Sequence, residues 1–294
     1  MTPTAPEPPK RHLTVALVQT DPGPDKVANV ERALAYVAEA AERGADLVAL
    51  PETFHCRGPN DVKRASAEPI PGPLSEALAA AAKAHGVFLL GGSFNELHDE
   101  PDDDRTYNTS LLFGLDGALL ARYRKIHLFD AVVAGKLSAR ESSRNRPGGE
   151  VVVADTAFGR VGLTICYDVR FPELYRALAI AGARIVFVPS NFTERTGRDH
   201  WEVLLRARAI ENGVFVVAPA TIGDGGGEGG FVAYGRSLVI DPWGTVLACA
   251  PDGEGITLAT LDLDRVDAVR ASLPTLHHLR PAAYANLVPQ GGPS

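Results

Sequence analysis

The sequence predicts an α/β protein in one large domain, and two observations carry this prediction. Short apolar segments that suit buried strands alternate with Ala-rich segments that suit helices over most of the 294 residues. Two further pairs of strand-like segments are each joined by a tight turn, as in a β-hairpin. A chain that mixes hairpins with strand–helix–strand units forms a mixed sheet, or two stacked sheets, covered by helices.

The first half of the chain predicts two strand–helix units, a third strand and a hairpin. Gly44 and Gly86 follow the two helical segments, where glycine readily adopts the left-handed backbone that ends a helix. The polar segment 123–150 is too long for an idle connection, so we expect it to be functional or locally ordered. The predicted elements are strands at 13–18, 46–50 and 87–91, helices at 25–44 and 74–85, and hairpin strands at 108–113 and 118–122.

The second half resumes the alternation and closes with another hairpin and a helix. Pro172 suits the first turn of a helix, because its fixed backbone angle matches the helix and its missing N–H is not needed there. The predicted elements are strands at 151–154, 160–165, 184–189 and 214–218, helices at 172–181, 199–212 and 262–272, and hairpin strands at 234–240 and 245–249.

Three regions divide the chain. Residues 1–11 are Pro-rich and polar and lack the apolar core of a signal peptide, so we expect a disordered tail. Residues 12–280 contain all the predicted elements and form a single domain, with no linker long enough to split it. Residues 281–294 are expected to form an irregular C-terminal arm.

Composition excludes several classes of function. A net charge of −7 argues against a nucleic-acid or anionic-membrane partner, and no apolar run reaches the roughly 18 residues that span a bilayer. Three cysteines (Cys56, Cys166 and Cys249) are too few and too scattered for a disulfide framework or a zinc site. These features predict a cytoplasmic protein in which a cysteine can remain a free thiol.

Cys166 is the most informative residue, because it ends an apolar strand-like run in the segment GLTICYDVRFPE. The polar residues after it and then Pro172 indicate a turn that leads into a helix. Helical N–H groups near a thiol favour its thiolate form, which is the nucleophile in cysteine enzymes. The alternative is a buried cysteine that acts as a small apolar side chain.

Glu52 and Lys125 are the other two candidates that the residues themselves suggest. Glu52 follows a predicted strand in LPETF, at the strand end where α/β proteins usually place their sites, so it is a candidate base. Taken alone, Glu52 fits a loop carboxylate that caps a neighbouring helix better than a base. Lys125, in YRKIHLFD, would be a fixed cation beside a developing oxyanion, or part of a basic surface strand with His127 as a structural neighbour.

Other candidates fail their own tests. Gly225, Gly227 and Gly230 match GxGxxG, but the strand-like residues that follow do not open a helix, so no dinucleotide site is predicted. Neither an HExxH nor a CxxC motif is present, and no metal is expected. Glu141 taken alone reads as a solvated charge in the polar segment.

Glu52, Lys125 and Cys166 in this order, each in its own local motif, resemble the carbon–nitrogen hydrolase (nitrilase) superfamily. The resemblance extends from ALVQT through LPETF, YRKIHLFD and GLTICYDVRFPEL to YGRSLVIDPWG. Within the superfamily, HLFD with RESSRNRPG and FTERTGRDHWE is similar to the Nit-type amidases, which include omega-amidases and deaminated-glutathione amidases. The resemblance implies a four-layer α-β-β-α sandwich that dimerises, or assembles further, through helices flanking the nucleophile.

The resemblance also assigns roles that the residues alone do not. It implies that Glu141 is a second active-site glutamate and that no cofactor is needed. It further implies that Arg170 and Thr196 hold a carboxylate of the substrate and that the N–H of Tyr167 joins the oxyanion site. The implied reaction is cysteine-dependent hydrolysis of the terminal amide of a small carboxylate-bearing substrate, through a thioester and with release of ammonia.

Several alternatives remain open at this stage. An N-carbamoyl amino acid amidohydrolase or a nitrilase would use the same Glu–Lys–Cys set, although nitrilases tend to have Cys-Trp-Glu where this chain has Cys166, Tyr167 and Asp168. A non-catalytic binding or scaffold protein is a further alternative, disfavoured by the intact set. A redox-sensing thiol protein would need a resolving cysteine, for which Cys56 is the candidate.

Overall fold

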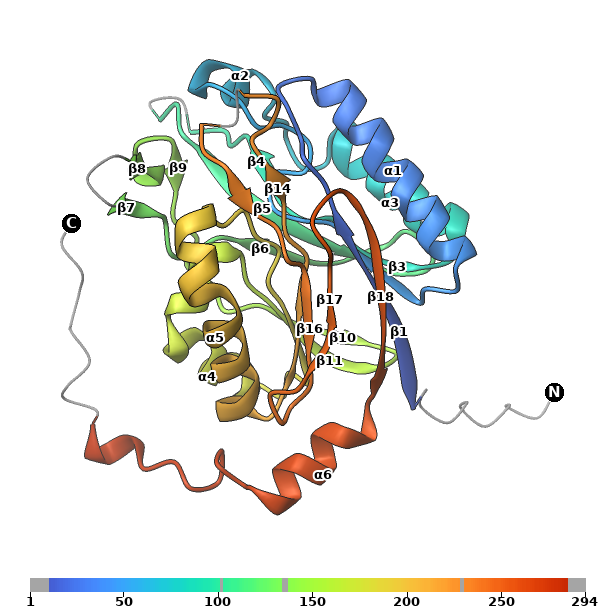
Figure 1. The fold of residues 1–294 in the computed structure, drawn as a ribbon, viewed down its shortest axis with the longest axis vertical. Coiled ribbons are helices and arrows are strands. Elements are labelled where there is room, and N and C mark those ends of the chain that lie inside the picture. Colours follow the sequence, from blue (N-terminus) through green and yellow to red (C-terminus); the bar gives the residue numbers. More distant parts are fainter. Residues whose placement is uncertain (1–10, 101–102, 134–136, 228–229, 285–294) are drawn as a thin grey trace.

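The computed structural model describes residues 11–100, 103–133, 137–227 and 230–284. Two β-sheets lie face to face, with helices α1 and α3 on the outside of one sheet and α4 and α5 on the outside of the other (Figure 1). This arrangement is the predicted four-layer α-β-β-α sandwich. The boundaries predicted for the tail, the domain and the arm stay predictions.

The first sheet has eight strands in the order β18-β1-β2-β3-β5-β4, with β6 and β9 also paired to β5. Its centre is parallel, since β1 pairs with β2 and β2 with β3 in the same direction, and its outer pairs are antiparallel. The strands are β1 (His12–Gln19), β2 (Leu47–Ala49), β3 (Phe88–Leu90), β4 (Phe94–Glu96), β5 (Thr106–Phe113), β6 (Leu119–Arg124), β9 (Asn145–Arg146) and β18 (Gly255–Asp262).

The second sheet has six strands in the order β10-β11-β12-β13-β16-β17, again with a parallel centre and antiparallel edges. The strands are β10 (Val153–Thr156), β11 (Gly159–Leu163), β12 (Ile185–Phe187), β13 (Phe215–Ala218), β16 (Leu238–Ile240) and β17 (Val246–Cys249). Two small ribbons stand apart from the sheets, formed by β7 (Asp130–Val133) with β8 (Leu137–Arg140) and by β14 (Ile222–Gly223) with β15 (Ala233–Tyr234).

Strand β1 shows how the two-residue period of a strand builds this sandwich. Leu13, Val15 and Leu17 belong to the apolar cluster shared with the second sheet, whereas Ala16 and Val18 belong to the cluster beneath α1 and α3. Because both faces of the strand are covered, it reads as a continuous apolar run rather than as an alternation of apolar and polar residues.

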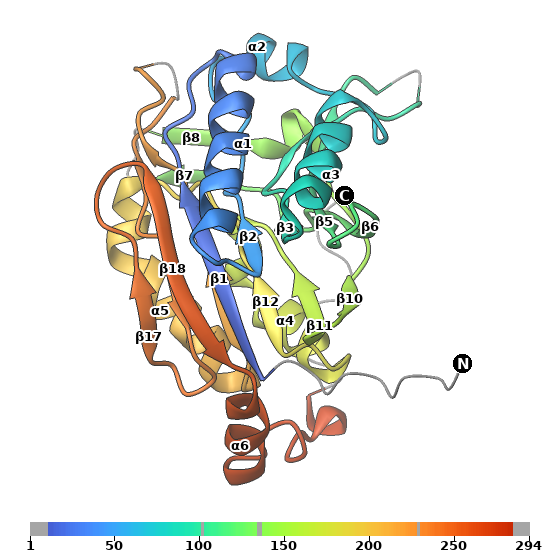
Figure 2. The ribbon, with the colours of Figure 1, turned by 90° about the vertical axis from the view of Figure 1, so that its right-hand side faces the viewer.

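The helices of the first sheet follow the predicted bounds closely. Helix α1 (Lys26–Glu42) begins after Asp25, whose carboxylate accepts a hydrogen bond from the N–H of Ala28 at 3.1 Å. Helix α3 (Pro73–His85) ends at Gly86, which has the positive φ of 61° that glycine tolerates. Figure 2 shows the two helices side by side over the same face of the sheet.

The helices of the second sheet include one that begins earlier than predicted. Helix α4 (Pro172–Ile180) starts at its proline as expected, whereas α5 (Glu194–Asn212) starts five residues before the predicted 199. The reason is a cap: the hydroxyl of Thr193 accepts a hydrogen bond from the N–H of Thr196 at 3.4 Å. Thr196 therefore lies in the first turn of a helix rather than in a loop.

The remaining differences concern one divided strand and elements that were not predicted. The predicted strand at 234–240 is divided between β15 and β16, which belong to different sheets, because Gly235 and Arg236 both have positive φ. Strand β18 and the short helix α2 (Asn60–Ala65) were not predicted. The described parts of the polar segment, 123–133 and 137–150, contain the strands β7, β8 and β9 and the 3₁₀ helix η1 (Glu141–Ser143).

A last helix, α6 (Asp264–Ser272), lies at one end of the sandwich and is followed by the short 3₁₀ helix η3 (Pro281–Ala283) (Figure 1). Among the helices of the described residues, none is long and apolar enough to cross a bilayer.

Candidate active site

Cys166 lies at a tight turn between β11 and α4, at the start of the 3₁₀ helix η2 (Cys166–Arg170). Its φ is 48°, a left-handed value that costs a residue with a side chain on the order of 1–2 kcal/mol. Its N–H donates a hydrogen bond at 3.0 Å to the carbonyl of Pro189, two residues beyond the neighbouring strand β12. The surrounding structure therefore holds the thiol in a strained position, as is common at functional sites.

Asp168 fixes this turn through a fully buried carboxylate. One of its oxygens accepts hydrogen bonds from the N–H of Ile165 at 2.8 Å and the hydroxyl of Tyr123 at 2.6 Å. The other oxygen accepts from the N–H of His127 at 3.0 Å and contacts its Nδ1 at 2.8 Å. The ring of His127 stacks on Phe171 with the centroids 3.5 Å apart. Tyr123 and His127 thus act as structural partners of the turn.

Lys125 lies between two glutamates on the first sheet's side of the site. Its ammonium donates to Oε1 of Glu52 at 3.0 Å and to the two oxygens of Glu141 at 3.1 and 2.9 Å. Asn108, from β5, donates its side-chain amide to the same two carboxylates at 2.9 and 3.3 Å. All four side chains are buried, so the charges and hydrogen bonds of the cluster act on one another at short range in a medium of low polarity.

Lys125 keeps its positive charge at neutral pH. Burial lowers the pKa of Lys125, but the carboxylates of Glu141 and Glu52 outweigh burial and hold that pKa well above its usual value. The ammonium is therefore a permanent cation, which suits the stabilisation of negative charge rather than the transfer of a proton.

Glu52 connects the two sheets at this point. Its second oxygen accepts a hydrogen bond at 2.7 Å from the N–H of Asn191, a residue that follows β12 of the second sheet. The Asn191 side chain donates to Thr53 at 3.3 Å and accepts from Thr221 at 2.8 Å. Glu52 is thereby held next to the turn that carries Cys166, where it can exchange a proton with the thiol.

The surroundings of Cys166 favour the protonated thiol. Burial is the largest cause, and together with the Glu52 carboxylate it raises the pKa of the thiol well above its usual value, although Lys125 lowers it. The resting enzyme therefore carries a thiol, and the attack on a substrate requires a base.

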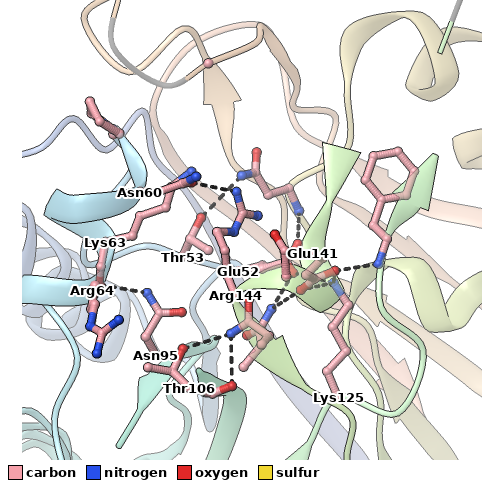
Figure 3. Close-up of a pocket in the computed structure, with 18 of the residues that line it drawn as sticks. Glu52, Thr53, Asn60, Lys63, Arg64, Asn95, Thr106, Lys125, Glu141 and Arg144 are labelled. Carbon is pink, nitrogen blue, oxygen red and sulfur yellow. Dashed lines mark hydrogen bonds and ion pairs between the residues drawn. The ribbon is translucent and has the colours of Figure 1, made fainter. Parts of the chain in front are cut away.

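A cavity of about 790 Å³ opens beside these groups. The four predicted catalytic residues Glu52, Lys125, Glu141 and Cys166 all line it. Figure 3 shows Lys125 and the two glutamates on one side of the cavity, with Lys63 and Arg64 of α2 on the other. The size is within the range of roughly 300–1,000 Å³ that is usual for small-molecule sites.

The three predicted substrate-binding residues are not among those that line this cavity. Arg170 lies over the rings of Tyr167 and Phe192, at 5.7 and 5.4 Å, and one of its guanidinium nitrogens is 3.3 Å from Nδ1 of His200. Thr196 is one helical turn before His200 on α5, so it shares a face with that histidine. The three residues thus gather on the α5 side of Cys166.

The comparison with known families decides the identity. Residues 14–271 match the carbon-nitrogen hydrolase family, which covers far more than half of the chain. The chain belongs to the carbon–nitrogen hydrolase family. The resemblance stated from the sequence is confirmed, and the chain is an amidase-type hydrolase of carbon–nitrogen bonds other than peptide bonds.

Two relatives of this carbon–nitrogen hydrolase have assigned activities. The human omega-amidase NIT2 is 40% identical over 271 residues, which is 92% of this chain and 96% of the relative. The bovine deaminated glutathione amidase is 42% identical over 277 residues, which is 93% of this chain and 84% of the relative. The sequence identity of this chain to the two relatives is therefore nearly equal.

Two solved structures share the fold. The C. elegans NitFhit protein superposes with a TM-score of 0.83 and 36% identity, over 94% of this chain and 66% of that one. Saccharomyces cerevisiae Nit3, a member of branch 10 of the nitrilase superfamily, gives 0.81 and 35%, over 92% of this chain and 97% of the other.

Several residues of this carbon–nitrogen hydrolase site were missed from the sequence. Asn108 and Asn191 contact the glutamates but carry no motif that marks them. Arg57, nearly fully buried, donates hydrogen bonds to the carbonyls of Gly223 and Phe231 at 3.2 and 2.6 Å. It thereby fixes both ends of the glycine-rich segment, and Phe231 lines the cavity. The glycine-rich segment is therefore held against the cavity by Arg57.

Two other possibilities can be compared with the structure. Among the described residues, no group of three or more His, Cys, Asp or Glu side chains could hold a metal ion. Cys56 is free and buried, with its thiol 3.7 Å from the carbonyl of Pro24, and it is not among the residues that line the cavity. A resolving role for Cys56 therefore gains no support.

Proposed function

We propose that this amidase hydrolyses the amide of a small carboxylate-bearing substrate through a thioester on Cys166. The observation that carries the proposal is the convergence of Glu52 and Lys125 on a cavity that also contains the Cys166 thiol. A base, a fixed cation and a nucleophile are the groups that acyl transfer requires.

In the first step, the sulfur of Cys166 attacks the amide carbonyl while its proton passes to Glu52. The raised pKa of the thiol makes this transfer necessary, because little thiolate exists at neutral pH. Formation of the carbon–sulfur bond places a negative charge on the carbonyl oxygen. The permanent ammonium of Lys125 and the N–H of Tyr167, at the start of η2, are the donors proposed to stabilise that oxyanion.

In the second step, the tetrahedral intermediate collapses to the thioester. The carbon–nitrogen bond breaks, and Glu52 gives its proton to the departing nitrogen. Glu52 then takes a proton from water, which attacks the thioester and releases the acid with restoration of the thiol. Glu141 contacts Lys125 through both oxygens and accepts from the N–H of Phe129 at 2.7 Å, so we assign it the positioning of Lys125 rather than proton transfer.

The carboxylate of the acyl group is assigned to Arg170 and Thr196. Arg170 forms no ion pair within the described residues, and its contacts are two aromatic rings and a histidine nitrogen. A guanidinium without a carboxylate partner suits a planar anion. The omega-amidase relative supports a substrate with a terminal amide and a carboxylate.

The experiment is a product screen that covers α-ketoglutaramate, deaminated glutathione, N-carbamoyl amino acids and nitriles. We expect acid product from the first two, and Cys166→Ala should abolish it while leaving the fold intact. Cys249→Ala is the matched control, because Cys249 is free and exposed, and it should retain full activity. Full activity of Cys166→Ala, or turnover of nitriles or carbamoyl compounds alone, would contradict the proposal.

We further propose that two copies associate through α4 and α5, in a reducing compartment such as the cytoplasm. Three apolar side chains on the outer face of these helices are exposed, namely Ile180, Val203 and Ile210. All three cysteines are free thiols. Light scattering during gel filtration should give the mass of a dimer or of a larger assembly, and Val203→Glu should shift it towards the monomer.

A further inference from the structure

Two carboxylates contact the same lysine, but the proposed mechanism passes the proton of Cys166 to only one of them. Glu52 and Glu141 lie close together beside Lys125 (Figure 3). One ammonium matches one of the two negative charges, and two carboxylates in one buried site compete for a proton. The groups around the pair must therefore determine which oxygen accepts the proton.

The hydrogen-bond donors that surround Glu141 occupy both of its oxygens. An ionised carboxylate has about four sites that accept a hydrogen bond, two on each oxygen. On Glu141, Oε1 accepts from Lys125 at 3.1 Å and from Asn108 at 3.3 Å. Its Oε2 accepts from Lys125 at 2.9 Å and from the N–H of Phe129 at 2.7 Å. These contacts fill the acceptor sites of Glu141, so a proton can reach it only by displacing a donor.

Glu52 differs from Glu141 in one acceptor site. Its Oε1 accepts from Lys125 at 3.0 Å and from Asn108 at 2.9 Å, so that oxygen is also filled. Its Oε2 accepts from the N–H of Asn191 at 2.7 Å, which leaves one site on this oxygen. A hydrogen bond between Glu52 and the thiol is among the causes that raise the pKa of Cys166. Since Oε1 is filled, the thiol proton is received by Oε2.

Asn108 occupies one site on each carboxylate through the two N–H bonds of its amide. A flipped amide would place Oδ1 against the carboxylate oxygens, so only one orientation is favourable. The backbone is fixed as well, because the carbonyl of Asn108 accepts from the N–H of Lys125 at 2.9 Å. The side chain is buried, yet its Oδ1 has no hydrogen-bond partner within the described residues. An unpaired buried oxygen lowers stability, so a purely structural role explains this asparagine poorly.

We propose that Asn108 is a positioning residue that directs the proton of Cys166 to Oε2 of Glu52. It fills one site on Oε1 of each glutamate and carries no charge, whereas a second cation would hold Glu52 ionised and weaken it as a base. The inference rests on the proposed function and leaves its steps unchanged. The proton moves from the sulfur to Oε2 as the carbon–sulfur bond forms, and from Oε2 to the departing nitrogen as the carbon–nitrogen bond breaks.

The test is Asn108→Leu, which keeps the approximate size of the side chain and removes both hydrogen bonds. The kcat/KM for α-ketoglutaramate should fall by about 10- to 100-fold, the effect of one lost hydrogen bond to a charged group. Loss of a donor to a carboxylate favours the protonated form, so the acidic limb of the kcat/KM profile should move to higher pH by about one unit. The other charged or titratable groups that act on Glu52 stay in place in this variant, namely Lys125, Glu141, Cys166 and Arg57.

Asn212→Leu is the matched control. Asn212 is also a buried asparagine whose Oδ1 has no partner in the described part of the chain, but its amide donates to the carbonyl of Arg208 at 2.9 Å, and it does not line the cavity. The control should lose stability without moving the acidic limb. If Asn108→Leu does not fold, Asn108→Asp keeps the shape and adds a third carboxylate to the pair, so it should move the acidic limb at least as far.

An infrared titration adds a measurement that does not depend on turnover. The carbonyl band of the protonated carboxyl group that is absent from Glu52→Gln should appear at higher pH in Asn108→Leu than in the wild-type enzyme. A control that shifts as far as Asn108→Leu would overturn the inference. If the band shifts only in Asn108→Leu but the wild-type enzyme cleaves neither α-ketoglutaramate nor deaminated glutathione, the proposed reaction is wrong and the role of Asn108 stands. If the wild-type enzyme cleaves α-ketoglutaramate but neither the limb nor the band moves in Asn108→Leu, the reaction stands and the role of Asn108 is wrong.

Discussion

The two sheets equip the site in different ways. The second sheet supplies the elbow, by which we mean residues 165–171 with Cys166 at a positive φ, and it is held by backbone contacts and by one buried carboxylate. The first sheet supplies the charged cluster of Glu52, Lys125 and Glu141, which is held by opposite charges in direct contact. Asn191 joins the two through its hydrogen bond to Glu52.

This difference separates two kinds of sensitivity. In the elbow, the conformation of the backbone sets where the sulfur lies, so loss of a support should act mainly on stability. In the charged cluster, each group sets the charge balance of the others, so loss of one group should change the rate and the pKa of the thiol. The following predictions test that separation, from the largest effect to the smallest.

Glu52→Gln should have the largest effect. Loss of the base should lower kcat/KM by about 10²–10⁴, the usual contribution of general acid–base catalysis. The Glu52 carboxylate raises the pKa of Cys166, so its removal should lower that pKa and make alkylation by iodoacetamide faster at neutral pH. Turnover would thus fall while thiol reactivity rises. An alkylation profile against pH that does not change would contradict the role of Glu52.

Lys125→Met should change the pKa of the Cys166 thiol in the opposite direction, upwards. Lys125 lowers the pKa of Cys166, so its loss should move alkylation to higher pH, and loss of an oxyanion donor should cost about 10²–10³ in rate. The two glutamates would remain buried without their cation, which typically destabilises by about 3–5 kcal/mol. Lys83→Met is the surface control. Alkylation and denaturant unfolding measure the two effects, and a shift of alkylation to lower pH would refute the assignment.

Asp168→Asn tests the elbow. The amide can replace only part of the hydrogen bonding of a carboxylate that accepts from two backbone N–H groups and a tyrosine hydroxyl. We expect a loss of about 1–3 kcal/mol in the free energy of unfolding, measured with urea. Asp155→Asn, at an exposed ion pair with Arg160, should change stability by less than about 1 kcal/mol. Equal effects of the two substitutions would show that the elbow does not depend on Asp168.

The smallest predicted effect is on the pH dependence of stability. It comes from His55, three residues after Glu52. Burial is the main cause that lowers its pKa to about 3, from the usual value of about 6.5. Below pH 6.5 the unfolded chain binds a proton that the folded chain does not, so the free energy of unfolding falls by up to about 1.4 kcal/mol per pH unit until about pH 3. Above pH 6.5 His55 contributes no pH dependence.

The measurement is urea unfolding at pH 7.5 and 5.5. The free energy of unfolding of His55→Gln should fall less between pH 7.5 and 5.5 than that of the wild-type protein. His85→Gln, at an exposed position, should show the same fall as the wild-type protein. If the two variants show the same dependence on pH, the neutral buried state of His55 is wrong.

The sequence predicted the layers and three catalytic candidates for a common physical reason. Apolar runs mark strands that are covered on both faces, and polar residues directly after such runs mark the strand ends where sites form. Glu52 and Cys166 follow β2 and β11 in this way, and Lys125 directly follows β6. Their local patterns were therefore visible without the structure.

What the sequence could not provide depends on contacts between distant segments. Glu141 was predicted as a site residue only through the family resemblance. Its role depends on its contact with Lys125, which lies on a different element. Asn191 and Arg144 have ordinary side chains in loops, and only the folded chain brings them to the cavity. The pKa of the Cys166 thiol likewise depends on distant contacts, since burial and the Glu52 carboxylate raise it.

The central claim is that Cys166 forms a thioester during turnover. The most direct test is intact-mass spectrometry of the enzyme, quenched in acid within milliseconds of mixing with α-ketoglutaramate. The account predicts an added mass equal to the acyl group on Cys166, absent from Cys166→Ala and retained in Cys249→Ala. Turnover without any adduct in the wild-type enzyme, or an adduct that persists in Cys166→Ala, would contradict it.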